Sequence, residues 1–219
     1  VVVIDPRCTA TCDIADLHLS LLPGSDAGLF VGLLNRIVAE GNAQSEFDDA
    51  AETFAIARDW SLARVAQFCG LDVADIVTFY DWFMRAPTAI TLYTMGINQS
   101  ASGSDKCNAI INVHLASGKF GRLGCGPFSL TGQPNAMGGR EVGGLATQLA
   151  AHMNFEPQDL ARLSRFWGTE RLAQTSGLMA VDLFEAIGKG DVKAVWIMGT
   201  NPAVSLPDSH AVCQALAAC

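Results

Sequence analysis

One segment of the chain combines an arginine, two uncharged amides and several glycines, a combination that suits binding of a planar anion. Residues 128–144 read FSLTGQPNAMGGREVGG and include five glycines. Arg140 follows a glycine pair where a helix is expected to begin, so its guanidinium and the free N–H groups of that helix could hold the anion together. Gln133 and Asn135 supply uncharged donors in the same loop. A salt bridge from Arg140 to Glu141 or another acid is the alternative.

Polar, glycine-bearing sequences also follow the expected strands, as in IDPRCT, YTMGINQSASGSD and IMGTNPAVSLPD. Ligands of open α/β sheets bind beyond the carboxyl ends of strands. Asp5 could therefore accept hydrogen bonds from ribose hydroxyls, or merely cap the turn before Pro6. Asp26, in PGSD, could bind the ring N–H and amino group of guanine, or simply begin a helix. Neither GxGxxG nor a Walker A sequence is present, which disfavours standard NAD and ATP sites.

The cysteines and histidines do not form a recognisable catalytic or metal-binding pattern. Seven cysteines are scattered along the chain, an odd number that argues against a disulfide framework and for a reducing compartment. Cys8 and Cys12 form a CxxxC that could be half of a metal site. No second ligand pair follows at suitable spacing, so we interpret them as two small apolar thiols near a strand end and expect no metal ligands. The four histidines are scattered and are expected to be packed or exposed.

Hydrophobic patterns and breakers predict alternating strands and helices. The expected strands cover residues 1–5, 15–19, 88–96 and 192–199. The expected helices cover residues 26–40, 46–58, 61–70, 73–85, 104–116, 140–153, 157–166 and 179–187, with a last one from about 208. This alternation predicts an α/β fold with a mainly parallel sheet. Trp196, in the last expected strand, is assigned to the core.

Composition excludes two classes of partner. The chain has 219 residues and a net charge of −8, and it lacks a Lys/Arg cluster, so no nucleic-acid partner is expected. Its apolar runs are too short to span a membrane, so no membrane partner is expected. The chain opens with VVVI and ends inside an apparent helix, HAVCQALAAC, which predicts a segment of a longer chain. Such a segment would leave apolar faces without partners, so we expect it to self-associate.

Three long stretches carry a resemblance to a known family. VVVIDPRCTATCDIADLHLSLLPGSD, TLYTMGINQSASGSDKCNAIINVHLASGKFGRLGCGPFSLTGQPNAMGGREVGG and VKAVWIMGTNPAVSLPD occur in that order. They resemble the molybdopterin oxidoreductases that carry molybdenum bis(molybdopterin guanine dinucleotide). Within that family the chain is most similar to the catalytic subunits of bacterial assimilatory nitrate reductases. The most specific part is TGQP…REVG, and the resemblance covers nearly the whole chain.

The resemblance implies roles for matched residues. Along one guanosine end of the cofactor it places Asp5, Arg7 and Thr9. Against the guanine and ribose it places Gly24, Ser25 and Asp26. Beside the pterin near the metal it places Met95, Gly96 and Gln99, and at the other dinucleotide Asn201. It implies that Gln133 and Arg140 line the substrate funnel above molybdenum, where Arg140 draws in and orients nitrate.

The resemblance also implies a fold and an activity. The fold is α/β, with parallel-sheet αβα sandwich domains of Rossmann-like dinucleotide-binding topology. Residues 1–127 would be part of one dinucleotide-binding domain, and residues 128–219 the funnel loop and part of a second. The complete protein would be a cytoplasmic nitrate reductase that receives electrons from ferredoxin, flavodoxin or an NADH-linked subunit.

The match departs from the family at several points. The family's cysteine ligand to molybdenum and the cysteines that hold a [4Fe–4S] cluster precede the matched region, so this segment alone is expected to be inactive. Ser20 and Leu22 stand where proline and arginine are expected in the nearest relatives. Alternatives are a periplasmic nitrate reductase or a formate dehydrogenase, although the latter should have arginine near Thr131. A non-catalytic nucleotide-binding α/β module is a further alternative.

Overall fold

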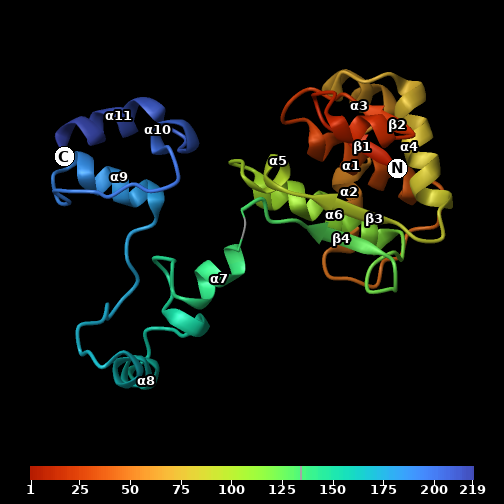
Figure 1. The fold of residues 1–219 in the computed structure, drawn as a ribbon. Helices are drawn as coiled ribbons and strands as arrows, with labels where there is room; N and C mark the ends of the chain where they lie inside the picture. Colours follow the sequence, from red (N-terminus) through yellow and green to blue (C-terminus); the bar gives the residue numbers. More distant parts are fainter. Residues whose placement is uncertain (134) are drawn as a thin grey trace. The chain divides into compact units, whose positions relative to one another are not determined.

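The chain forms two compact units, which are described here separately. The computed structural model describes residues 1–133 and 135–219, and the units are Val1–Gly132 and Gln133–Cys219 (Figure 1). The predicted domain boundary after residue 127 stays a prediction. Among the described residues no helix is long and apolar enough to cross a membrane.

The first unit contains four short strands and most of the longer helices. In chain order its elements are β1 (Val2–Ile4), the 3-10 helix η1 (Ala10–Ile14), β2 (Leu17–Leu19), α1 (Asp26–Ala39), α2 (Ala50–Ala57), α3 (Leu62–Cys69), α4 (Val73–Arg85), β3 (Ile90–Tyr93), α5 (Met95–Asn98), α6 (Gly103–Ala116) and β4 (Gly126–Ser129). Local signals set several bounds. Ser61 Oγ accepts a hydrogen bond from Arg64 N at the start of α3, and Gly70 ends that helix in the left-handed region, with φ +67°.

The strands pair in parallel, which confirms the predicted α/β class. β1 pairs with β2, with Ile4 opposite Leu19, and β3 pairs with β4, with Tyr93 opposite Ser129. The strands form two separate pairs instead of one continuous sheet. β4 is not among the expected strands, because its sequence GPFS contains a glycine and a proline, which strands disfavour.

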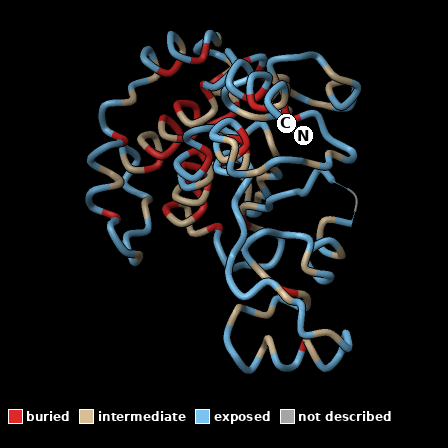
Figure 2. Tube along the Cα trace, turned by 90° about the vertical axis from the view of Figure 1, so that its left-hand side faces the viewer, coloured by how far each residue is buried: buried red, intermediate tan, exposed pale blue. Residues whose placement is uncertain are grey.

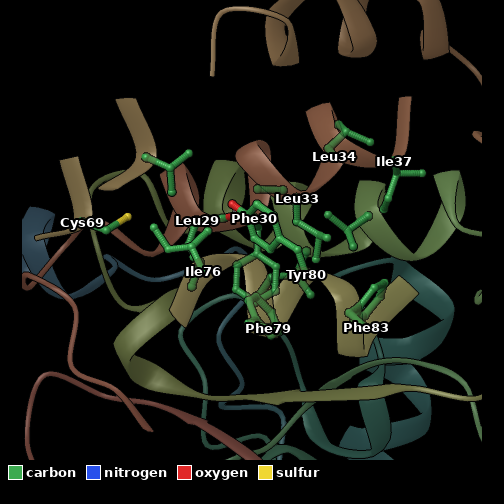
Figure 3. Packing of buried hydrophobic residues seen from close by; sticks show 14 of the residues in the cluster. Leu29, Phe30, Leu33, Leu34, Ile37, Cys69, Ile76, Phe79, Tyr80 and Phe83 are labelled. Carbon is green, nitrogen blue, oxygen red and sulfur yellow. Dashed lines mark hydrogen bonds between the residues drawn. The ribbon is translucent and has the colours of Figure 1, made fainter. Parts of the chain in front are cut away.

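Helix α1 organises the core of the first unit. One face of this helix buries Leu29, Phe30, Leu33, Leu34 and Ile37, which pack with residues of α3 and α4 (Figure 3). The Tyr80 hydroxyl donates to the Leu29 carbonyl at 2.6 Å and crosses from α4 to α1. Each fully buried leucine of this kind contributes about 1.5–3 kcal/mol. Figure 2 shows the buried positions as short stretches between exposed ones, as expected where helices bury one face.

The second unit contains helices joined by long irregular segments, and no strand is formed by its described residues. Its elements are α7 (Ala136–Glu141), the 3-10 turn η2 (Ala150–His152), α8 (Pro157–Trp167), α9 (Ala180–Gly188), α10 (Pro202–Ser205) and α11 (Ser209–Ala218). The helix predicted for residues 140–153 is wrong. Asn135 Oδ1 accepts from Gly138 N and starts α7 earlier, and Gly143, with φ +77°, follows its end.

The strand predicted for residues 192–199 is also wrong. The segment is extended, but no strand of the described residues pairs with it. Val192, Val195 and Ile197 pack on the small core formed by α9 and α11. Trp196, expected in the core, is 85% exposed. Only residues 195–198 alternate between partly buried and exposed positions, and without a neighbouring strand they form no ladder.

Candidate functional site

The parallel pairing of β1 and β2 brings two of the predicted binding segments to one edge. The Asp5 amide donates to the Leu19 carbonyl at 3.3 Å, and Ser20 Oγ donates to the Pro6 carbonyl at 3.1 Å. Residues that follow β1 therefore lie beside those that follow β2. This is the relationship that ligand binding at the carboxyl ends of neighbouring strands requires.

Asp5 holds the turn that follows β1. Its Oδ1 accepts from the Arg7 amide at 2.7 Å and lies 3.7 Å from Arg7 Nε. The Arg7 side chain is 81% exposed, so this ion pair adds little to stability. Thr9 precedes η1, and its carbonyl accepts from the Cys12 amide at 2.8 Å. Asp5 thus caps the turn and pairs with the Arg7 guanidinium, which stays largely exposed.

The segment after β2 contains an open glycine and two residues whose polar atoms already have partners. Gly24 has φ +87°, and a Cβ added to it would meet nothing within 4 Å. The Ser25 side chain donates to the Leu22 carbonyl at 2.6 Å. Asp26 Oδ2 lies 3.3 Å from Lys106 Nζ in a largely buried ion pair. The predicted contacts of Ser25 and Asp26 with a nucleotide must therefore coexist with these bonds.

Lys106 was not among the residues predicted for the site. A signal was present, because Lys106 shares one helical face with Ala109, Ile110 and Val113, which are all buried. A lysine on the apolar face of a helix indicates a buried partner, since an unpaired ammonium is costly to bury. That partner is Asp26, which is far away in the sequence.

The carboxyl ends of β3 and β4 bring the glycine-rich segment against Met95. The Leu130 amide donates to the Tyr93 carbonyl at 2.7 Å. A Cβ built on Gly132 would come within 2.3 Å of Met95 Cε, so a larger residue would push the flexible end of the Met95 side chain aside. Beside it, Gly96 in α5 has open space where a Cβ would lie. Gln99 follows α5 and is exposed.

Arg140 lies at the end of its helix, where the sequence analysis expected a beginning. It occupies the last turn of α7 and is exposed, so the N-terminal N–H groups of its own helix lie at the opposite end from its position. Glu141, its suggested salt-bridge partner, lies 2.8 Å from His152 Nε2 instead. Among the described residues no ion pair is formed by Arg140. Its charge is therefore available to an anion.

Gln133 and Asn201 also belong to the second unit. Gln133 is exposed at the start of this unit. Asn201 precedes α10, and its carbonyl accepts from the amides of Val204 and Ser205, both at 3.0 Å. The exposed Asn201 side chain is left for a ligand. Of the twelve predicted site residues, Gln133, Arg140 and Asn201 belong to the second unit. The other nine belong to the first unit, where they follow the strands at its two strand edges.

A third possible metal ligand, His18, lies close to the two thiols of the CxxxC sequence. One ligand atom each from Cys8, Cys12 and His18 lie within 4.8 Å of one another. The pKa of the Cys8 thiol is raised, chiefly by the neighbouring Cys12 charge and then by a hydrogen bond with Cys12. Sequence spacing alone missed His18. The pairing of Val3 with His18 in β1 and β2 brings it beside the loop.

Comparisons with known proteins match the whole chain to one family. The sequence model of the family described as Molybdopterin oxidoreductase matches residues 1–219. A nitrate reductase of Klebsiella oxytoca is 76% identical over 100% of this chain and 25% of its own length. A nitrate reductase of Shewanella frigidimarina is 48% identical over 100% of this chain and 24% of its own length. The chain thus spans about a quarter of these curated relatives.

A solved structure supports the fold. The acetylene hydratase of Pelobacter acetylenicus matches with a TM-score of 0.64 and 18% identity, over 99% of this chain and 33% of its own. At that identity the likeness concerns the fold alone.

Proposed function

The chain belongs to the molybdopterin oxidoreductase family, and from this premise we propose that it is part of a nitrate reductase. The proposed reaction consumes nitrate, two electrons and two protons and releases nitrite and water. The observation that carries the proposal is the 76% identity to a nitrate reductase along the entire chain. We further propose that the enzyme is assimilatory and cytoplasmic.

We propose molybdenum bis(molybdopterin guanine dinucleotide) as the cofactor, and the donor set at the two strand edges fits it. Gly24 and Gly96 leave room for a ligand close to the backbone. The carboxylates of Asp5 and Asp26 can accept hydrogen bonds from ribose hydroxyls and from guanine N–H groups. The nucleotide part of the cofactor would also contact Arg7, Thr9 and Ser25. The pterin part would contact Met95 and Gln99, and the second dinucleotide would contact Asn201.

When bound, the molybdenum centre would supply the two-electron redox couple for oxygen-atom transfer. This chain's own residues bind and orient the substrate. The exposed Arg140 guanidinium matches the planar nitrate anion and can donate two parallel hydrogen bonds. Such a charge-assisted contact contributes about 1.5–3 kcal/mol. Gln133 donates an uncharged hydrogen bond from the beginning of the same unit.

Other components of the reaction are proposed from the resemblance. A [4Fe–4S] cluster and the cysteine ligand of molybdenum would belong to other parts of the complete protein. Electrons would arrive from ferredoxin, flavodoxin or an NADH-linked subunit. Thr131, where a formate dehydrogenase should have arginine nearby, favours nitrate over formate as substrate.

The test is nitrate-dependent oxidation of reduced viologen by the full-length protein, with molybdenum quantified in the same sample. Activity together with bound molybdenum is the expected result. Bound molybdenum without nitrate turnover would support the proposed cofactor and overturn the proposal that nitrate is the substrate. Neither metal nor turnover, in protein matured with the cofactor pathway present, would favour the non-catalytic nucleotide-binding module.

A further inference from the structure

The thiols of Cys8 and Cys12 and the imidazole of His18 form a cluster that the proposed nitrate chemistry does not use. Their ligand atoms lie within 4.8 Å of one another. Cys8 is exposed, whereas Cys12 and His18 are partly buried. Ligand atoms around a tetrahedral zinc ion, with Zn–S about 2.3 Å, lie about 3.8 Å apart. The cluster is therefore slightly wider than a closed zinc site, and its exposed member, Cys8, is the side chain least held by packing.

The hydrogen bond of His18 prepares one ring nitrogen as a metal ligand. His18 Nε2 lies 2.8 Å from the Asp5 carbonyl oxygen. A carbonyl can only accept, so Nε2 carries the proton and Nδ1 keeps its lone pair. Metal-binding histidines commonly donate the other ring N–H to a carbonyl in this way, which orients the ring.

The surroundings of the thiols favour a cation. Cys12 Sγ lies 4.0 Å from the Arg7 carbonyl oxygen and 3.9 Å from Thr9 Oγ1, so oxygen atoms border the cluster. Asp13 adds a negative charge close enough to act on Cys8. The Arg7 guanidinium, which is the nearby positive charge in the loop, is paired with Asp5.

We propose that Cys8, Cys12 and His18 bind a zinc ion. Two sulfur ligands and one nitrogen suit this borderline-soft cation, and three protein ligands leave a fourth position to water. Binding releases the two thiol protons and leaves a neutral site. Because His18 belongs to β2, the ion would tie the loop after β1 to that strand, next to Asp5, Arg7 and Thr9.

The experiment uses the reduced full-length protein, equilibrated with zinc chloride and freed of unbound metal by gel filtration. The variants are C8S/C12S, which removes both sulfur ligands, and H18Q, whose amide can still donate to the Asp5 carbonyl. The matched control is C213S/C219S, which removes two exposed thiols elsewhere. Zinc content is measured by mass spectrometry, and the coordination by X-ray absorption.

We expect C8S/C12S to hold about one zinc equivalent less than the parent, H18Q to bind zinc more weakly, and the control to match the parent. The parent-minus-variant absorption spectrum should show sulfur at about 2.3 Å. Equal zinc in parent and C8S/C12S would overturn the proposal. A Cys8–Cys12 disulfide in the reduced parent, detected by peptide mapping, would overturn it as well. Zinc content is independent of nitrate turnover, so this test and that of the nitrate reductase are separable.

Discussion

Lys106 and Asp26 join α6 to the first turn of α1 through a largely buried ion pair. The Nζ–Oδ2 distance is 3.3 Å, and the two side chains are 7% and 15% exposed. Asp26 is at the same time a proposed ligand of the guanine. The pair therefore engages one carboxylate oxygen, and the proposed guanine contact would use the other.

Replacing Lys106 by methionine should destabilise the contact between α1 and α6. A partly buried carboxylate left without its partner costs about 3–5 kcal/mol. Hydrogen exchange of peptides from both helices is measured in the full-length protein. It reports how much the free energy of local opening falls in K106M relative to the unsubstituted protein. The double variant D26N/K106M removes both charges and should recover part of it. Unchanged exchange in K106M would contradict this view of the pair.

Replacing Arg140 by alanine should weaken nitrate use and leave the molybdenum content unchanged. Loss of about 1.5–3 kcal/mol corresponds to about a 10- to 150-fold fall in kcat/KM for nitrate. Arg165 is a matched control, because it is an exposed arginine of α8 whose Nε donates to the Ala161 carbonyl of its own helix. Loss of molybdenum in R140A would make Arg140 a structural residue.

Replacing Gly32 by alanine should destabilise the first unit, although alanine is the better helix former. The added Cβ would come within 2.3 Å of Val65 Cγ2 and 2.5 Å of Tyr80 Oη. Overpacking of this kind costs about 1–3 kcal/mol, more than the helix propensity gained. Gly188 in α9 is the control, because its added Cβ would lie 3.9 Å from Ala215. We expect G188A to be neutral or stabilising in thermal unfolding, and equal effects of both changes would refute the packing argument.

Protonation of His114 should loosen α6 at acid pH. His114 is fully buried between Thr91 Oγ1 at 2.8 Å and the Lys119 carbonyl at 3.1 Å. Burial lowers its pKa below the ordinary 6.5. The unfolded chain thus binds the proton more readily, so this stability is complete above 6.5 and falls as the pH drops toward the lowered pKa, by at most about 1.4 kcal/mol per pH unit.

The measurement for His114 is hydrogen exchange of α6 peptides between pH 7 and 5, corrected for the intrinsic exchange rates. H114Q supplies the reference, because its amide does not titrate in this range. The same pH dependence in both proteins would assign the effect to other groups.

The extended segment 192–199 should make the isolated chain self-associate. Trp196 and Met198 are 85% and 72% exposed, and the backbone has no neighbouring strand among the described residues. Unpaired strands with apolar side chains associate readily. Light scattering should show oligomers, and the double change W196K/M198K should reduce them. A monodisperse unsubstituted chain would contradict the prediction.

Helix bounds were predictable where local signals decide them. The sequence predicted a helix from Val73 to Arg85, which α4 matches. Ser61 and Gly70 delimited α3 because a hydroxyl cap and a left-handed glycine act within a few residues. The helix expected from Arg140 failed because Asn135 starts a short helix earlier, through a left-handed backbone conformation that the sequence alone does not show.

The sequence by itself determined the α/β class, most of the helices and the types of residue available at the strand ends. It also carried the family resemblance, because motifs are contiguous. The tertiary structure alone decided which of these residues meet. Lys106 reaches Asp26 because α6 packs on α1, His18 joins Cys8 and Cys12 because β1 and β2 pair in parallel, and Met95 covers Gly132 because β4 pairs with β3. Such contacts join residues far apart in the chain, and their free energy comes from packing that no local pattern contains.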